Sequence, residues 1–161
     1  MHSIFLFIFI IINLVVVTSV RAETWVLPPH GIDIFGQIRT TQASRTETLL
    51  DIARQYDIGQ IEILLANPTV DRWLPEDGAK VILPSRYIIP HAERKGLVLN
   101  LPEMRIYYFP ETKQGEKPMI TTYPVGIGRM DWVTPLGVSK IVEKKKDPTW
   151  TPPKSLQMDR I

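Results

Sequence analysis

Few side chains in this sequence could serve as a nucleophile or a general base. The 161 residues include three histidines and no cysteine. His30 and His91 each follow a proline, and we expect both to be solvated loop residues. Ser139 and Lys140 are adjacent, and neighbours in a strand point to opposite faces, so they make a poor nucleophile–base pair. Ser155 lies among the last residues. We therefore assign no catalytic residue.

An acidic cluster is the next candidate for chemistry. Asp71, Glu76 and Asp77 lie close together in the sequence. Carboxylates of this kind could bind a metal ion or serve as acid and base in glycoside hydrolysis. Pro75 and Gly78 flank them, however, and this combination is typical of a turn. The sequence therefore predicts turn residues here, with no metal site and no cofactor.

The most distinctive stretch begins with the letters YPVGIGRMDWVTPLG. Gly126 and Gly128 follow an apolar, strand-like run, and Thr134, Pro135 and Gly137 come shortly afterwards. Glycines after a strand allow a bulge or a tight turn. The same five residues could instead shape the floor of a substrate cleft. We favour the structural role and assign them no catalytic step.

This stretch resembles the first half of the L,D-transpeptidase catalytic domain, the YkuD-type fold. The resemblance implies a β-sandwich, no metal or cofactor, and acyl transfer through a cysteine thioester with a histidine as base. The family's histidine and Ser-His-Gly-Cys-type turn come later in the domain than Ile161, the last residue here. We therefore expect 96–161 to be the N-terminal part of that domain, and the chain as given to be inactive.

The resemblance also implies partners. Enzymes of this family cross-link or trim the stem peptides of peptidoglycan. The donor would be a tetrapeptide, and the acceptor a diaminopimelate amine or a lysine of an outer-membrane lipoprotein. Near-neutral net charge, +2 for the whole chain, gives no case for nucleic acid.

Two short helices are expected before residue 84. Ser44 to Glu47 fits a capping box, and Leu49, Ile52, Ala53 and Tyr56 follow at helical spacing. The second helix has an apolar face and ends at a proline. Its face residues would be Ile61, Leu64 and Leu65, and Asn67 would end it in the left-handed conformation before Pro68.

A strand precedes these helices and another follows them. The first covers 34–41, with Ile34, Gly36, Ile38 and Thr40 on one side, and the second covers 80–83. This βααβ order resembles a LysM module over 35–84, which implies binding of peptidoglycan glycan. A small spacer domain without glycan binding is the alternative. The matching residues are Thr48, Leu49, Ile52, Ala53, Tyr56, Ile63, Leu64, Asn67, Pro68, Leu74, Pro75, Gly78, Val81, Ile82, Leu83 and Pro84.

After a polar linker at 85–95, the pattern is that of short strands joined by turns. Residues 96–101 and 104–109 predict a hairpin, 119–125 a third strand, and 138–142 a fourth. No helical stripe is evident from residue 96 onward. This predicts an all-β layer structure.

The first residues look like an export signal. An apolar run from Ile4 to Val17 is followed by Val20-Arg21-Ala22, a small-residue cleavage pattern. The run is shorter than the roughly 20 residues of a membrane span. We therefore predict a signal peptide at 1–22, an extended segment at 23–34 that leads into the first domain, and a location in the periplasm or cell wall.

The expected fold class is α+β: a βααβ module followed by an incomplete all-β sandwich. Our main functional hypothesis is a peptidoglycan L,D-transpeptidase family protein. The alternatives are a non-catalytic peptidoglycan-binding protein that acts through 35–84, and a chain with no function.

Overall fold

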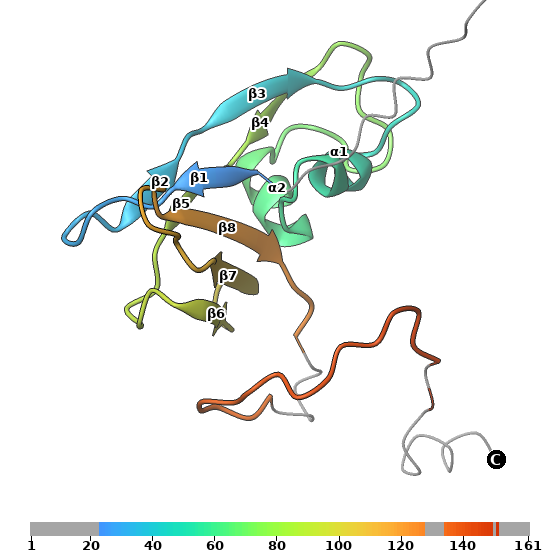
Figure 1. The fold of residues 1–161 in the computed structure, drawn as a ribbon. Coiled ribbons are helices and arrows are strands. Elements are labelled where there is room, and N and C mark those ends of the chain that lie inside the picture. Colours follow the sequence, from blue (N-terminus) through green and yellow to red (C-terminus); the bar gives the residue numbers. More distant parts are fainter. Residues whose placement is uncertain (1–22, 128–133, 150, 152–161) are drawn as a thin grey trace, which may run out of the picture. The chain divides into compact units, whose positions relative to one another are not determined.

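The computed structural model describes residues 23–127, 134–149 and 151, and the chain divides into two units after Ile127. A four-stranded antiparallel sheet organises the first unit (Figure 1). Its order is β1 (Thr24–Val26), β8 (Met119–Pro124), β7 (Arg105–Phe109) and β6 (Gly96–Asn100). The predicted hairpin and third strand are thus confirmed. The extended segment at 23–34 also contributes a strand, because β1 pairs with β8.

A two-stranded ribbon contains the strands on either side of the helices. β2 (Ile34–Gly36) pairs with β5 (Arg86–Ile88), and β3 (Arg39–Gln42) pairs with β4 (Lys80–Leu83). Gln37 N donates to Ser85 O at 2.9 Å, which joins the two pairs into one antiparallel ribbon. The strand predicted at 34–41 is therefore interrupted. The predicted linker at 85–95 contains β5, which the sequence analysis missed.

The buried side of this ribbon is the opposite of the predicted one. Phe35 is buried, whereas Ile34 and Ile38 are more than half exposed. Phe35 packs with Trp25, Tyr87 and Tyr107, with ring centroids 5.5–6.4 Å apart. One large aromatic side chain buries more area than an isoleucine, so the aromatic cluster sets the orientation.

The N-cap of helix α1 (Leu49–Gln55) lies four residues later than predicted. Thr48, not Ser44, is the N-cap: its hydroxyl accepts from Asp51 N at 3.1 Å, and Asp51 Oδ2 accepts from Thr48 N at 3.0 Å. Ser44 instead bonds to Thr46 in a turn. The apolar stripe is confirmed, because Leu49, Ile52 and Ala53 are buried.

Helix α2 (Gln60–Ala66) buries Ile63, while the predicted face residues Ile61 and Leu65 are exposed. Asn67 ends the helix with φ −131°, so the left-handed ending predicted for it was wrong. Its buried amide donates to Ile63 O (2.8 Å) and Ile82 O (2.9 Å) and accepts from Ile82 N (2.7 Å). Asn67 thus ties the end of α2 to β4 with three hydrogen bonds.

Two apolar clusters form in the first unit. One lies between the helices and the β3–β4 pair and is centred on Leu49, Ile52, Ile63 and Val81. The other lies against the four-stranded sheet and contains Phe35, Tyr87, Tyr107, Phe109 and Ile120. Strands outnumber helices in the described part of the chain, as expected for a mostly β protein.

In the second unit, residues 134–149 and 151 contain no helix or strand. The strand predicted at 138–142 is therefore wrong. Val138 and Val142 are almost fully exposed, and no described strand pairs with them. Because a strand is stabilised by its neighbours and by burial of one face, a short, partly apolar stretch does not form one by itself.

The predicted signal peptide at 1–22 lies outside the described residues. Within the part that the structure describes, no helix has the length and apolar character to cross a bilayer.

Candidate functional site

A buried arginine joins the helices to the sheet. Arg105 on β7 is 1% exposed. Its guanidinium donates to Glu62 Oε2 on α2 at 2.8 Å, to Asp57 O in the α1–α2 loop at 3.1 Å, and to Thr122 Oγ1 on β8 at 3.2 Å. The tyrosine ring of β5 lies 4.1 Å from the guanidinium carbon, a cation–π contact. One side chain therefore contacts four separate segments.

Two acidic residues lie next to the Arg105 guanidinium, Glu62 and Asp57. Glu62 Oε2 also accepts from Gly59 N at 2.7 Å, a bond that caps α2. Burial raises the pKa of the Asp57 carboxyl, while the positive charge of Arg105 opposes that rise. Glu62, which is partly exposed, supplies the negative charge that the buried Arg105 guanidinium requires.

A second carboxylate lies in the β6–β7 turn. Glu103 Oε2 accepts from Tyr107 Oη at 2.6 Å and from Asn100 Nδ2 at 2.8 Å. Burial, followed by this bond to the carboxylate, raises the pKa of Tyr107, so its hydroxyl stays protonated and keeps donating at neutral pH. No described ion pair includes Glu103. Its negative charge is fixed in orientation and is not paired with a cation in the described part.

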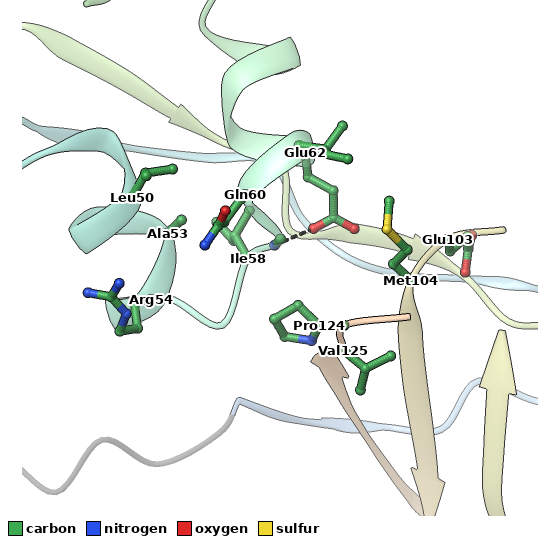
Figure 2. Close-up of a pocket in the computed structure, with 13 residues that line it drawn as sticks. Leu50, Ala53, Arg54, Ile58, Gln60, Glu62, Glu103, Met104, Pro124 and Val125 are labelled. Atoms are coloured by element: carbon green, nitrogen blue, oxygen red, sulfur yellow. Dashed lines mark hydrogen bonds between the residues drawn. The ribbon is translucent and has the colours of Figure 1, made fainter. Parts of the chain in front are cut away.

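A cleft of about 400 Å³ opens between these elements (Figure 2). The α1 end, the α1–α2 loop and α2 form one wall, and the β6–β7 turn with the end of β8 forms the other. Ile58, Met104, Pro124 and Val125 give it an apolar lining. Val125 N donates to Met104 O at 2.8 Å, so the second wall is one hydrogen-bonded unit.

The five motif residues are divided between the units. Gly126 is exposed and lines the cleft directly after β8. Thr134, Pro135 and Gly137 belong to the second unit, where Thr134 is half-buried and the other two are exposed. Gly128 lies outside the described residues. Whether these positions are structural or form a substrate cleft stays a prediction.

The remaining candidates occupy the places expected for surface residues. His30 and His91 are exposed in loops. Asp71 Oδ1 accepts from the backbone N–H of Trp73 and of Leu74, both at 2.8 Å, as in a turn. These two bonds lower the pKa of Asp71. Among the described residues, no group of acidic or histidine side chains could hold a metal ion.

One segment of the chain matches a known protein family. Residues 94–161 match the model of the L,D-transpeptidase catalytic domain. This match covers β6, β7 and β8, and the mostly β structure is consistent with the sandwich of that domain. The resemblance to the L,D-transpeptidase catalytic domain is thus confirmed for residues 94–161.

Three proteins of Escherichia coli K12 are similar to a larger part of the chain. Those named probable L,D-transpeptidase YcfS, ErfK/SrfK and YbiS are 37%, 38% and 36% identical over 135, 134 and 138 residues. The alignments cover 82%, 81% and 84% of this chain, and 41%, 42% and 44% of those proteins. The similarity therefore extends to residues before 94, and the chain spans less than half the length of these relatives.

Sequence reasoning did not identify Arg105, Glu62 or Glu103. The sequence did contain a pattern that could have indicated Arg105. Arg105, Tyr107 and Phe109 occupy alternate positions along β7, and all three are buried. A charge at an alternating core position requires a buried partner. The carboxylates gave no such signal, because Glu62 lies in the preceding helix and Glu103 in a turn.

Proposed function

We propose that the protein to which these residues belong is a peptidoglycan L,D-transpeptidase. The observation that carries this proposal is the match of residues 94–161 to the catalytic domain, together with relatives at 36–38% identity that bear the L,D-transpeptidase name. In this proposal, strands β6–β8 and the glycine-rich stretch after them are the first part of the catalytic domain. A cysteine and a histidine outside the 161 residues would carry out the acyl transfer.

The proposed substrates are the stem peptides of peptidoglycan. A tetrapeptide donor would form a thioester, and a diaminopimelate amine or the lysine of an outer-membrane lipoprotein would accept the acyl group. Such substrates require export, in agreement with the signal peptide predicted at 1–22 and with a location in the periplasm or cell wall. The chain as given contains no cysteine, so we expect these 161 residues alone to be inactive.

The test is product analysis on purified sacculi. The reading frame that includes these residues, expressed to its stop codon, is incubated with sacculi, with and without purified outer-membrane lipoprotein as acceptor, and the muropeptides are separated by chromatography with mass detection. The proposal predicts new cross-links between two diaminopimelate residues, or peptides attached to lipoprotein. An unchanged muropeptide profile, obtained with a folded protein and an active relative as reference, would contradict it.

A second candidate function is glycan binding by a LysM-like module at 35–84. The favouring observation is the β3–α1–α2–β4 order, with an antiparallel β3–β4 pair and the helices packed on it through Leu49, Ile63 and Val81. The test is co-sedimentation of the full chain with sacculi from which the stem peptides have been removed. Binding to the bare glycan supports the module, and loss of binding when the peptides are removed counts against it.

A further inference from the structure

The ribbon formed by β2, β5, β3 and β4 has one buried face and one exposed face. From Lys80 to Ile89, every odd-numbered residue is buried and every even-numbered residue is exposed or half-buried. In the facing strands even-numbered residues pair with these even-numbered ones, as Ile34 does with Ile88. Successive side chains of a strand point to opposite faces, so the even-numbered residues share one outer face. The outer face consists of Ile34, Gly36, Ile38, Thr40, Gln42, Lys80, Ile82, Pro84, Arg86 and Ile88.

Isoleucine is the main apolar residue of the outer face. Ile34 and Ile88 lie directly opposite each other and are 57% and 60% exposed. Ile38 and Ile82 are also exposed, farther along the same ribbon. The face of an antiparallel sheet that meets water is normally polar. Packing among the described residues therefore does not account for these isoleucines.

The charges on the outer face are all positive. Lys80 and Arg86 are exposed, and neither belongs to an ion pair among the described residues. The residue opposite Arg86 is Gly36, so no side chain covers Arg86 from the partner strand. None of the outer-face residues is acidic. The outer face thus combines exposed aliphatic area with two cations that have no counter-charge on the same face.

This combination of residues disfavours another protein as the occupant. If a second copy docked through the same outer face, the cations of both copies would be brought together with no acid to pair with them. Specific protein interfaces are also enriched in aromatic residues at their centre. The outer face contains no aromatic residue. Its chemistry fits a partner that is anionic at its surface and aliphatic just below it.

A bilayer that contains anionic phospholipid has this layered chemistry. The methylene stems of lysine and arginine lie along apolar surface while their charged groups stay in the polar layer. Basic residues are attracted to anionic headgroups, and apolar side chains are buried at the boundary between headgroups and acyl chains. The strands hold both kinds of side chain on one side of the ribbon, so the two attractions act together.

We propose that the outer face of the ribbon docks on the surface of a bilayer that contains anionic phospholipid. Lys80 and Arg86 contact the phosphate groups, and the isoleucines reach the acyl boundary. The contact is peripheral and holds the protein at the membrane surface. All outer-face residues precede the segment 94–161 that matches the catalytic domain, so the proposal does not depend on acyl transfer.

The experiment is co-sedimentation with lipid vesicles. The reading frame is expressed from Glu23 to its stop codon, so that the apolar run in 1–22 is absent. One set of vesicles contains phosphatidylcholine alone, and the other contains equal amounts of phosphatidylcholine and phosphatidylglycerol. We expect binding to the anionic vesicles to be about 25-fold tighter, since each cation near an anionic surface contributes about fivefold. Added salt should reduce this ratio.

Substitution of the two cations tests the charge contribution. Lys80→Gln combined with Arg86→Gln should remove most of the preference for anionic vesicles. The matched control combines Lys113→Gln with Lys117→Gln, which makes the same change of net charge in the exposed loop between β7 and β8. The control should keep the preference. Thermal unfolding of each variant checks that it is folded.

Substitution of the isoleucines tests the apolar contribution. Ile34→Thr combined with Ile88→Thr should weaken binding to anionic vesicles severalfold, and threonine suits a strand because it is also β-branched. The matched control combines Leu97→Thr with Leu99→Thr on β6, where both leucines are similarly exposed but lie off the ribbon. The control should bind as the wild type does.

Three results would overturn the assignment. The first is equal binding, or no binding, by the wild type to both kinds of vesicle. The second is binding to anionic vesicles that neither ribbon variant weakens more than its control. The third is a concentration-dependent dimer in analytical ultracentrifugation that Ile34→Thr with Ile88→Thr abolishes, which would assign the outer face to a second copy. None of these results bears on acyl transfer, which is measured from the muropeptides.

Discussion

Arg105 and Glu62 are 43 residues apart in the sequence and form an ion pair with an N–O distance of 2.8 Å. The pair links the four-stranded sheet to α2, so the βααβ segment and the strands that match the L,D-transpeptidase domain are held by a direct contact. The Arg105 side chain is 2% exposed and that of Glu62 28% exposed. The cost of removing Glu62 is therefore mainly that of leaving the buried Arg105 charge unpaired.

Glu62→Gln should lower the free energy of unfolding by about 3 kcal/mol, because it leaves the buried Arg105 cation without a counter-charge. Glutamine still accepts from Gly59 N, so the α2 cap is kept. The measurement is urea denaturation, with Glu76→Gln as the exposed control. A loss below about 0.5 kcal/mol would show that the pair is not buried as described.

Thr48→Ala should cost about 1 kcal/mol, since it removes the hydroxyl that accepts from Asp51 N at the start of α1. Ser44→Ala, at the position that the sequence pattern favoured, should cost only a few tenths of a kcal/mol because Ser44 lies in an exposed turn. Thermal unfolding of both variants checks the order. Equal losses of stability, or a larger loss for Ser44→Ala, would contradict Thr48 as the N-cap and favour Ser44.

Gly36→Ala should be the most damaging glycine substitution in the ribbon. Gly36 has φ +76°, and a Cβ there would lie 2.1 Å from the backbone oxygen of Ser85. Gly78 has the same φ, but open space surrounds its Cβ position, so Gly78→Ala should lose only the roughly 1–2 kcal/mol of left-handed strain. Unfolding free energies of the two variants provide the comparison. A smaller loss at position 36 would contradict the close approach to Ser85.

Alkaline pH should destabilise the fold through two buried tyrosines. Burial raises the pKa of Tyr87 to about 12, above its ordinary value of 10.0, and also raises that of Tyr107. Their contribution is fully present below pH 10 and is lost as the pH rises, because the unfolded chain ionises first. Phenolate absorbance should show two of the five tyrosines titrating late. If all five tyrosines ionised near pH 10, the burial of Tyr87 and Tyr107 would be contradicted.

Local patterns in the sequence were sufficient for part of the fold. The Leu49, Ile52 and Ala53 stripe predicted α1, and two strand-like runs on either side of Pro102-Glu103 predicted the β6–β7 hairpin. Both elements are formed by contacts between neighbours in the sequence. Such contacts leave a periodic signal that can be recognised without the fold.

Long-range pairing left no comparable signal. β1 pairs with a strand about 95 residues later in the chain, and β5 forms because β2 offers it a partner. Conversely, the partly apolar stretch at 138–142 forms no strand, and no described strand pairs with it. The candidate cleft depended on the same kind of pairing. Glu62 and Arg105 meet only after helix and sheet have packed together.

The most direct test of the proposed function is intact-mass spectrometry after incubation with a carbapenem. The reading frame containing these residues, expressed to its stop codon, should gain the mass of one acyl adduct. Peptide mapping should locate that adduct on a cysteine outside the 161 residues. The 161-residue chain alone should gain none, because it has no cysteine. A longer product that folds and gains no adduct, or an adduct on the 161-residue chain, would contradict cysteine-based acyl transfer.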